Sequence, residues 1–297
     1  MSDYNPSLCD ICDMPAMYGD GSTWAKCGKH QRESTPTVEL KVVEASPAQP
    51  LPHEGQPHQT IPGLMSVIIP VYNVNYSLFH YTGHCIGAIR YFSGDNPIEI
   101  IVVDNGSTAK PGSMNDWHAD KIITNETNLG YVKAVNQGIR CAFGEYIAVI
   151  CTDVQVYENW IEDAKEALTK VDLVYAKPMY GEPFSRMLEA RNHRAKWLDK
   201  PVEASLNNDV KDGSCLITTK KLLDTVGILD EGFFNYAADS DLFKRIEQAG
   251  LKYAGSEKIR TFHVSHATGY VLEGDAEQMN VDKEYYQQKW QGQNFQS

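Results

Sequence analysis

The sequence predicts an α/β fold in which a mostly parallel central sheet is flanked by helices. Short apolar runs rich in Val and Ile alternate with longer stretches whose apolar residues have helical spacing. Such runs suit strands buried on both faces, and strands that alternate with helices are typical of a parallel sheet with right-handed crossovers. The chain has 297 residues, 42% hydrophobic and 22% charged, which is long enough for one large domain and a small appendage.

The alternation is most regular in the first part of this domain. Strands are expected at the apolar runs 65–71, 98–104, 121–124, 145–150 and 172–176. Helices are expected at 76–92, 131–143 and 157–169. In the second helix Val132, Val135 and Ile139 recur at the spacing of one helical face, which predicts that this face packs against the sheet.

The second half of the chain is less regular. The elements expected there are a strand at 213–218, helices at 219–225 and 239–249, and a polar C-terminal helix at 276–290. We place the main domain at residues 64–275, and the C-terminal helix and tail at 276–297.

Two close pairs of metal-binding residues lie near the N-terminus, separated by a Gly-containing turn: Cys9, Cys12, Cys27 and His30. This is a ligand set that structural Zn²⁺ takes tetrahedrally. Residues 1–32 are therefore predicted to be a zinc knuckle or ribbon whose folding depends on the metal. The Pro-rich stretch at 33–63 is predicted to be a linker.

Charge and cysteine usage narrow the class of protein. The formal net charge is −12, so the chain as a whole lacks the basic field that binds nucleic-acid phosphates. No apolar run reaches the roughly 18 residues of a membrane span, and the first residues do not resemble a signal peptide. The other cysteines are scattered through apolar segments, which predicts reduced, buried thiols: Cys85, Cys141, Cys151 and Cys215. We therefore expect a cytoplasmic protein without a membrane span.

Polar residues follow three of the expected strands. Asp104 ends the second strand, Asp153 follows the fourth, and the first runs into "PVYN" at 70–73. Asp and Asn are common turn residues, so each one alone is explained equally well as part of a turn. Together they predict a ligand site, because ligands bind at the carboxyl edge of open α/β sheets.

Five stretches carry a family resemblance: "SVIIPVYN", "IIVVDNGST", "TNLGYVKAVNQGI", "AVICTDVQV" and "GILDEGFFNYAADSDLFKRIEQAG". Their order and spacing resemble the family 2 glycosyltransferases, which have the A-type, Rossmann-like glycosyltransferase fold. The resemblance covers about residues 65–270 and leaves out the cysteine-containing segment and the linker. It implies transfer of a sugar, with inversion, from a nucleoside-diphosphate donor, UDP-linked by preference, to an acceptor hydroxyl.

The same resemblance implies a nucleotide-binding set: Pro70, Tyr72, Asn73, Asp104, Asn128 and Gly130. An aromatic face and an amide after the first strand suit a base, and Asp104 would accept a hydrogen bond from the base or ribose. Asn128 is explained equally well as a helix cap or turn residue, and Gly130 permits a close approach or a left-handed turn.

A divalent cation is also implied. Asp153 resembles the last carboxylate of the family's Asp-x-Asp motif, which holds Mn²⁺ or Mg²⁺ against the diphosphate. The first acid of the motif is replaced by Cys151, which leaves a thin coordination set. His263 resembles the family's late metal or diphosphate ligand and fits that position better than His266. A structural role is an equal alternative for His263 and the favoured one for His266.

Asp239 is the expected general base. The family's base lies just before a helix, where it takes the proton of the attacking hydroxyl, and the Glu that often precedes it is Ala238 here. An Asp at this place is also a favoured N-cap, and both roles can coexist. Arg245 is expected to pair with Asp241 at i,i+4.

Other classes of protein have less support. No expected strand is followed by G-x-G-x-x-G, and neither a P-loop nor a G-x-S-x-G motif is present. The main alternative is a catalytically silent sugar-nucleotide or glycan-binding protein with a zinc docking module, because two acids of the family pattern are replaced. The expected acceptor is a glycan or lipid-linked sugar bound near 178–212; a hydroxylated base in DNA is disfavoured by the acidic balance.

Overall fold

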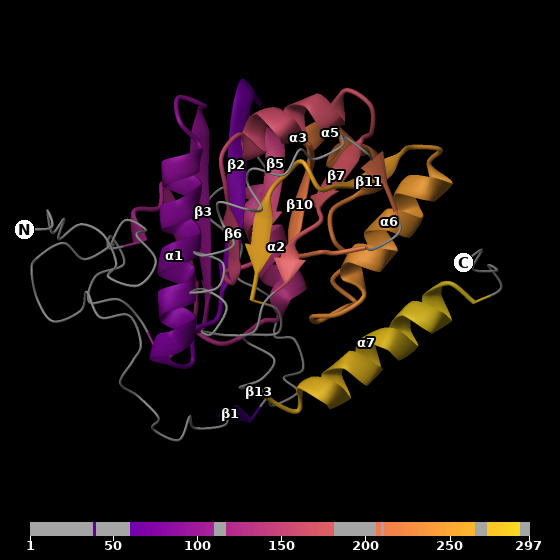
Figure 1. Cartoon of the computed structure of the whole chain (residues 1–297). Helices are drawn as coiled ribbons and strands as arrows, with labels where there is room; N and C mark the ends of the chain where they lie inside the picture. The colour runs from indigo at the N-terminus through magenta and orange to yellow at the C-terminus, as the bar shows by residue number, and fades with distance from the viewer. Residues whose placement is uncertain are drawn as a thin grey trace, which may run out of the picture.

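A mixed eight-stranded sheet forms the centre of the molecule (Figure 1). The computed structural model describes residues 38–39, 60–109, 117–180, 206–208, 211–264 and 272–291. Across the sheet the strands are ordered β4 (Lys121–Asn125), β3 (Ile98–Asn105), β2 (Ile61–Val71), β5 (Gly144–Ile150), β10 (Cys215–Thr219), β7 (Leu173–Ala176), β11 (Tyr253–Ser256) and β9 (Leu206–Asn207). Their pairings are parallel except those of β10 and β9.

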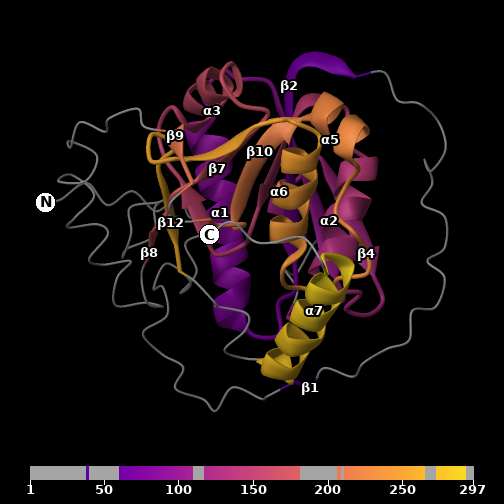
Figure 2. The ribbon, with the colours of Figure 1, turned by 90° about the vertical axis from the view of Figure 1, so that its right-hand side faces the viewer.

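Helices cover both faces of this sheet (Figure 2). One face carries α1 (Tyr76–Phe92) and α3 (Trp160–Leu168), and the other carries α2 (Tyr131–Arg140), α5 (Lys220–Val226) and α6 (Ala238–Gln248). Neighbouring residues of β2 divide between two apolar clusters: Val67 and Ile69 pack with α1, and Ile68 packs with α2. Burial on both faces explains why the central strands read as continuous apolar runs.

The C-terminal helix α7 (Asp275–Lys289) lies on the same side as α2 and α6 (Figure 2). Most residues of this helix are polar, yet Tyr285 and Tyr286 pack against the apolar cluster of that face. Asp282 is buried, with 1% of its surface exposed. A buried carboxylate needs hydrogen-bond donors, and these come from the loop that leads into α6.

Two small sheets accompany the large one. β6 (Val154–Val156), β12 (Thr261–His263) and β8 (Met179–Tyr180) form a three-stranded sheet with β12 in the middle. β1 (Val38–Glu39) pairs in parallel with β13 (Leu272–Glu273), so two residues of the predicted linker form a strand.

The predicted mixture of helices and strands is confirmed, with shifted ends. α1 spans the expected 76–92, because the side chain of Asn75 accepts a hydrogen bond from the N–H of Leu78 at 2.9 Å and caps the helix. The helix expected at 131–143 ends at Arg140, because the N–H of Cys141 turns back to Gly138. The helix expected at 157–169 begins at Trp160, since the N–H of Tyr157 donates to the carbonyl of Arg260.

Some predictions lie outside the described residues. These are the zinc segment with Cys9, Cys12, Cys27 and His30, most of the linker, His266, and most of the segment 178–212. The scattered cysteines are described as free thiols. Cys85 and Cys215 are buried as predicted, whereas Cys141 and Cys151 are only partly buried. Among the described helices, none combines the length and apolar character needed to cross a membrane.

Candidate active site

A cleft of about 450 Å³ opens at the edge of the sheet where β2 and β5 end. The predicted site residues that line it are Pro70, Tyr72, Asn128, Asp153, Asp239 and His263. Lys211 to Ser214, just before β10, line it as well. Because β10 runs antiparallel to β5, its beginning lies at the edge where the parallel strands finish.

Asn73 and Asp104 do not line the cleft. Each is almost fully buried, and both bind Ser107 in the turn after β3. The N–H of Asn73 donates to Ser107 Oγ at 2.9 Å, and Asp104 Oδ1 accepts from the N–H of Ser107 at 3.0 Å. They therefore hold this turn against the end of β2, and a direct contact with a nucleotide stays a prediction for both.

Asn128 lines the cleft and also organises the start of α2. Its Oδ1 accepts hydrogen bonds from Asn105 Nδ2 at 2.8 Å and from the N–H of Gly130 at 2.9 Å. Gly130 is buried with φ 90°, and a Cβ there would lie 2.7 Å from Phe234. Only glycine fits such a position without strain, so the close approach predicted for Gly130 is made to the loop before α6.

Asp153 and His263 face each other in the cleft. His263 Nε2 lies 3.4 Å from Asp153 Oδ1, and the N–H of Val264 donates to the carbonyl of Asp153 at 3.0 Å. The antiparallel pairing of β12 with β6 sets this contact, since His263 is opposite Val154. Two residues predicted for one cation are thus neighbours in space although they are far apart in the chain.

Asp212 is a third member of this cluster, and sequence reasoning missed it. Asp212 Oδ2 lies 3.6 Å from His263 Nδ1, and Asp212 Oδ1 accepts from the N–H of Ser214 at 2.6 Å. Burial would lower the pKa of His263, but the carboxylates of Asp153 and Asp212 raise it to about 9. In the sequence Asp212 is followed by Gly213, and an Asp-Gly pair before a strand is typical of a turn, so it did not indicate a site residue.

Cys151 occupies the place of the family's first metal-binding acid and lines the cleft. Burial raises the pKa of its thiol well above the ordinary value, and Asp153 and Asp212 add to the effect. The thiol is therefore neutral at physiological pH. A bound cation would itself lower the pKa of this thiol, but Mn²⁺ and Mg²⁺ prefer carboxylate oxygen to sulfur, so Cys151 is a weaker ligand than the acid it replaces.

Asp239 lies in the first turn of α6, where it faces the cleft. The N-cap is Ala237, in a left-handed conformation with φ 61°, so Asp239 is not the N-cap considered from the sequence. Burial raises the pKa of Asp239; the N–H of Ser240 opposes this shift, and the nearby Asp212 carboxylate adds to it. A carboxylate with a raised pKa is a stronger base than an ordinary Asp and suits proton abstraction.

Asp282 of α7 holds the loop that precedes Asp239. Its carboxylate accepts three successive backbone N–H groups, from Phe234 at 3.0 Å, Asn235 at 2.8 Å and Tyr236 at 2.7 Å. Successive N–H groups turned toward one anion form a strong charge-assisted site. All three residues line the cleft, so α7 fixes part of its wall.

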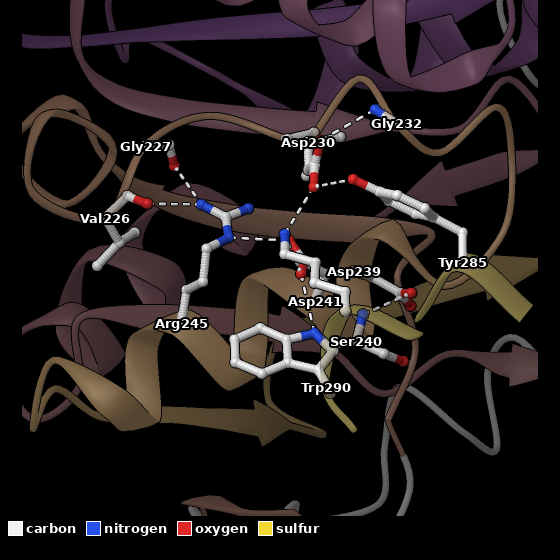
Figure 3. A network of polar contacts seen from close by, with 12 residues as sticks. Val226, Gly227, Asp230, Gly232, Asp239, Ser240, Asp241, Arg245, Tyr285 and Trp290 are labelled. Atoms are coloured by element: carbon white, nitrogen blue, oxygen red, sulfur yellow. Dashed lines mark hydrogen bonds and ion pairs between the residues drawn. The ribbon is translucent and has the colours of Figure 1, made fainter. Parts of the chain in front are cut away.

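Asp241 anchors the other end of α7 (Figure 3). It is fully buried and accepts from Arg245 Nε at 2.9 Å, which confirms the expected i,i+4 pair. Trp290 Nε1 donates to the same carboxylate at 3.1 Å, and Lys289 Nζ lies 2.6 Å from it. In Figure 3 the carboxylate of Asp239 points away from this network, toward the N–H of Ser240. In the first turn of α6, Asp241 therefore anchors α7, whereas Asp239 is left to face the cleft.

The cleft could share a cation with a bound ligand. Within the described residues, no group of three or more His, Cys, Asp or Glu side chains is arranged to hold a metal alone. Mg²⁺ and similar hard cations usually take one or two protein carboxylates and complete their shell with water and substrate phosphates. Asp153 with the adjacent His263 fits such a shared site once the cation displaces the proton of His263, since an imidazole binds a metal in its neutral form.

Comparison with known proteins gives a family match. The model of the family described as Glycosyl transferase family 2 matches residues 66–226. Glycosyltransferase GlyG of Streptococcus pneumoniae serotype 4 is 34% identical over 114 residues. That match covers 37% of this chain and 36% of the pneumococcal protein, so it spans little more than a third of that relative.

Solved structures share the fold. TarS (1–349) of S. aureus superimposes with a TM-score of 0.50 at 18% identity, covering 77% of this chain and 72% of that one. The mannosyltransferase PcManGT from Pyrobaculum calidifontis, solved with GDP-Man and Mn²⁺, has a TM-score of 0.50 at 19% identity, covering 74% of this chain and 62% of that one. At these identities the likeness extends to the fold alone.

Proposed function

The chain belongs to glycosyl transferase family 2, and on that premise we propose that it transfers a sugar from a nucleoside-diphosphate donor to an acceptor hydroxyl. The observation that carries the proposal is the cleft shared by Asp153, His263 and Asp239. Asp153 and His263 offer an oxygen and an imidazole nitrogen as ligands for a cation. Asp239 separately offers a carboxylate of raised pKa that can accept a proton.

Asp239 is the proposed general base. An acceptor hydroxyl that attacks the anomeric carbon loses its proton to the carboxylate, and direct attack opposite the leaving diphosphate inverts the configuration. The raised pKa of Asp239 favours this proton transfer, and the Asp282-held loop at 234–236 fixes the start of its helix.

Asp153 and His263 are the proposed ligands of Mn²⁺ or Mg²⁺. A divalent cation bound there would neutralise charge on the diphosphate leaving group. The mannosyltransferase PcManGT, which shares the fold, was solved with GDP-Man and Mn²⁺, which is consistent with this assignment. Asp212 Oδ2 lies 3.6 Å from the second ring nitrogen, where a small shift would let it orient His263, the role that a carboxylate commonly plays beside a metal-binding His.

Pro70, Tyr72 and Asn128 form the proposed nucleotide end of the cleft. Burial raises the pKa of Tyr72, and the neighbouring Asn128 side chain opposes this shift, so the aromatic ring and the amide are close together. A ring face and polar edge suit a base such as uracil, so UDP is the preferred nucleotide. Asn73 and Asp104 support this end through Ser107.

The decisive experiment is donor turnover. The purified chain is screened against a panel of sugar nucleotides with and without Mn²⁺, and release of nucleoside diphosphate is measured together with the melting temperature. We expect one donor to be hydrolysed slowly, and Asp239→Asn to abolish release while donor binding persists. Binding without turnover across donors, acceptors and metals would instead identify a silent sugar-nucleotide-binding protein, the alternative suggested by Cys151 and Ala238.

We also propose that Cys9, Cys12, Cys27 and His30 bind one structural Zn²⁺. Metal analysis of the full chain after extensive dialysis should give one zinc per chain. Cys9→Ser combined with Cys27→Ser should remove it, whereas Cys141→Ser, a change at a cysteine outside this segment, should leave it in place. A chain that holds no zinc in either form would rule the assignment out.

A further inference from the structure

A second cavity, of about 510 Å³, adjoins the cleft at Asp239. The two hollows share Lys211, Tyr236, Ala237 and Asp239. Ser240, Lys244 and Glu247 line the second cavity from α6, and Met279, Lys283, Tyr286 and Gln287 line it from α7. Each set follows the i, i+4, i+7 spacing, so one face of each helix is turned toward this cavity. The proposed base therefore stands where the two hollows meet.

Lysines gather around this cavity in a chain whose net charge is −12. Lys211, Lys244 and Lys283 line it, against two carboxylates, Asp239 and Glu247. Glu247 already accepts from Tyr253 Oη at 2.6 Å and lies 4.0 Å from Lys244 Nζ. Lys283 makes no ion pair with any residue in the described part of the chain. Among the described residues that line the cavity, three ammonium groups thus face two carboxylates.

We propose that this cavity is the acceptor subsite and that it selects an acceptor carrying an anionic group, a phosphate ester or a carboxylate. Lysine binds phosphate as a point charge, and its ammonium suits either anion. Tyr236 and Tyr286 supply aromatic faces against which a sugar or polyol chain can pack. With the anion held by Lys244 and Lys283, an acceptor hydroxyl reaches Asp239 at the junction of the two hollows.

The inference rests on the proposed transferase function, which it deepens by naming the class of acceptor. It involves α6 and α7, which lie beyond the residues matched by the family model. A neutral acceptor would gain nothing from the lysines, and desolvating their ammonium groups would cost free energy. Charge on the acceptor is therefore the property that the experiment varies.

The experiment is calorimetric binding of three matched three-carbon probes to the full chain: glycerol, glycerate and glycerol 3-phosphate. UDP and Mn²⁺ are present in one series, to occupy the cleft, and absent from another. We expect the phosphate ester to bind more tightly than glycerol, and Lys283→Gln and Lys244→Gln each to weaken it about tenfold, as loss of one charge-assisted contact should. Lys283→Arg should restore binding. The matched control is Lys221→Gln, an exposed lysine of α5 that lines neither hollow, and it should have no effect.

Each outcome has a defined meaning. Preference for the phosphate ester over glycerate names phosphate as the anion, and equal binding of the two extends the class to carboxylates. Anion binding that is independent of Lys283 and Lys244, or no stronger than binding of glycerol, overturns the inference. Donor turnover in the sugar-nucleotide panel without such binding leaves the transferase standing and refutes the anionic acceptor alone. Lysine-dependent binding without turnover of any donor refutes the transferase and, with it, the acceptor assignment.

Discussion

Asp282→Asn should loosen the wall of the active-site cleft without changing the size of the side chain. The carboxylate is 1% exposed and accepts three backbone N–H groups and the amide of Gln278, the last at 3.1 Å. The amide oxygen of Asn can keep the two bonds made by Oδ2, to Asn235 and Tyr236. Its NH₂ group then faces the N–H of Phe234, so one buried donor loses its partner and the retained bonds lose their charge assistance.

An unsatisfied buried donor costs about 1–3 kcal/mol, and a hydrogen bond to a charged group is worth roughly 1 kcal/mol more than a neutral one. With two retained bonds weakened, we therefore expect Asp282→Asn to lower the free energy of unfolding by about 3–5 kcal/mol, measured by urea denaturation. α7 should stay docked, because Trp290 and Lys289 still bind Asp241. The matched control is Gln278→Ala, which removes one of the four donors and leaves the three backbone bonds intact.

The same substitution should lower kcat more than it raises KM for the donor. The loop at 234–236 leads directly into α6, so its loosening displaces Asp239, whereas Asp153 and His263 are held by other strands. A variant with wild-type unfolding free energy and wild-type turnover would refute this reasoning. A fall in stability with unchanged kcat would limit Asp282 to the fold and remove it from the positioning of the base.

Other predictions concern single positions. Because the folded-state pKa of His263 is raised to about 9, its stabilising contribution is complete below about pH 6.5 and disappears as pH rises through 9. Melting temperatures measured in EDTA should therefore separate His263→Gln from wild type most at pH 6 and least above pH 9. The raised pKa of Asp239 should place the acid limb of kcat/KM above the pH of an ordinary Asp, and a limb near pH 4 would argue against this base. Gly130→Ala should lower both the melting temperature and the turnover, because φ is 90° and the new Cβ would lie 2.7 Å from Phe234. Unchanged values would show that the loop containing Phe234 moves to accept the methyl group without cost.

Local patterns were sufficient to predict most elements. The helix at 76–92 was predicted with both ends correct, and the structure shows that the side chain of Asn75 caps its start. The central strands were readable because residues such as Ile68 and Ile69 face opposite apolar clusters, which requires an unbroken apolar run. The short strands β6 and β12, with three residues each, carry no such signal. They exist because they pair with each other.

Several site residues could be named from the chain alone, and their neighbours could not. Asp153, His263 and Asp239 stand beside recognisable strings of residues, so their chemistry was apparent before their positions. Asp212 was missed because it precedes its strand, and a residue before a parallel strand would lie at the opposite edge of the sheet. The antiparallel direction of β10 reverses that expectation and brings Asp212 beside His263.

The amino-acid order therefore specified the α/β alternation and the identity of the reactive side chains, because these depend on residues close together in the chain. The tertiary fold supplied the direction of β10, the contact of His263 with two carboxylates, and the docking of α7. Asp282 and Phe234 are 48 residues apart, and nothing local to either reveals that one binds the other. Such contacts arise when whole elements pack, since a buried carboxylate must find donors wherever the fold brings them.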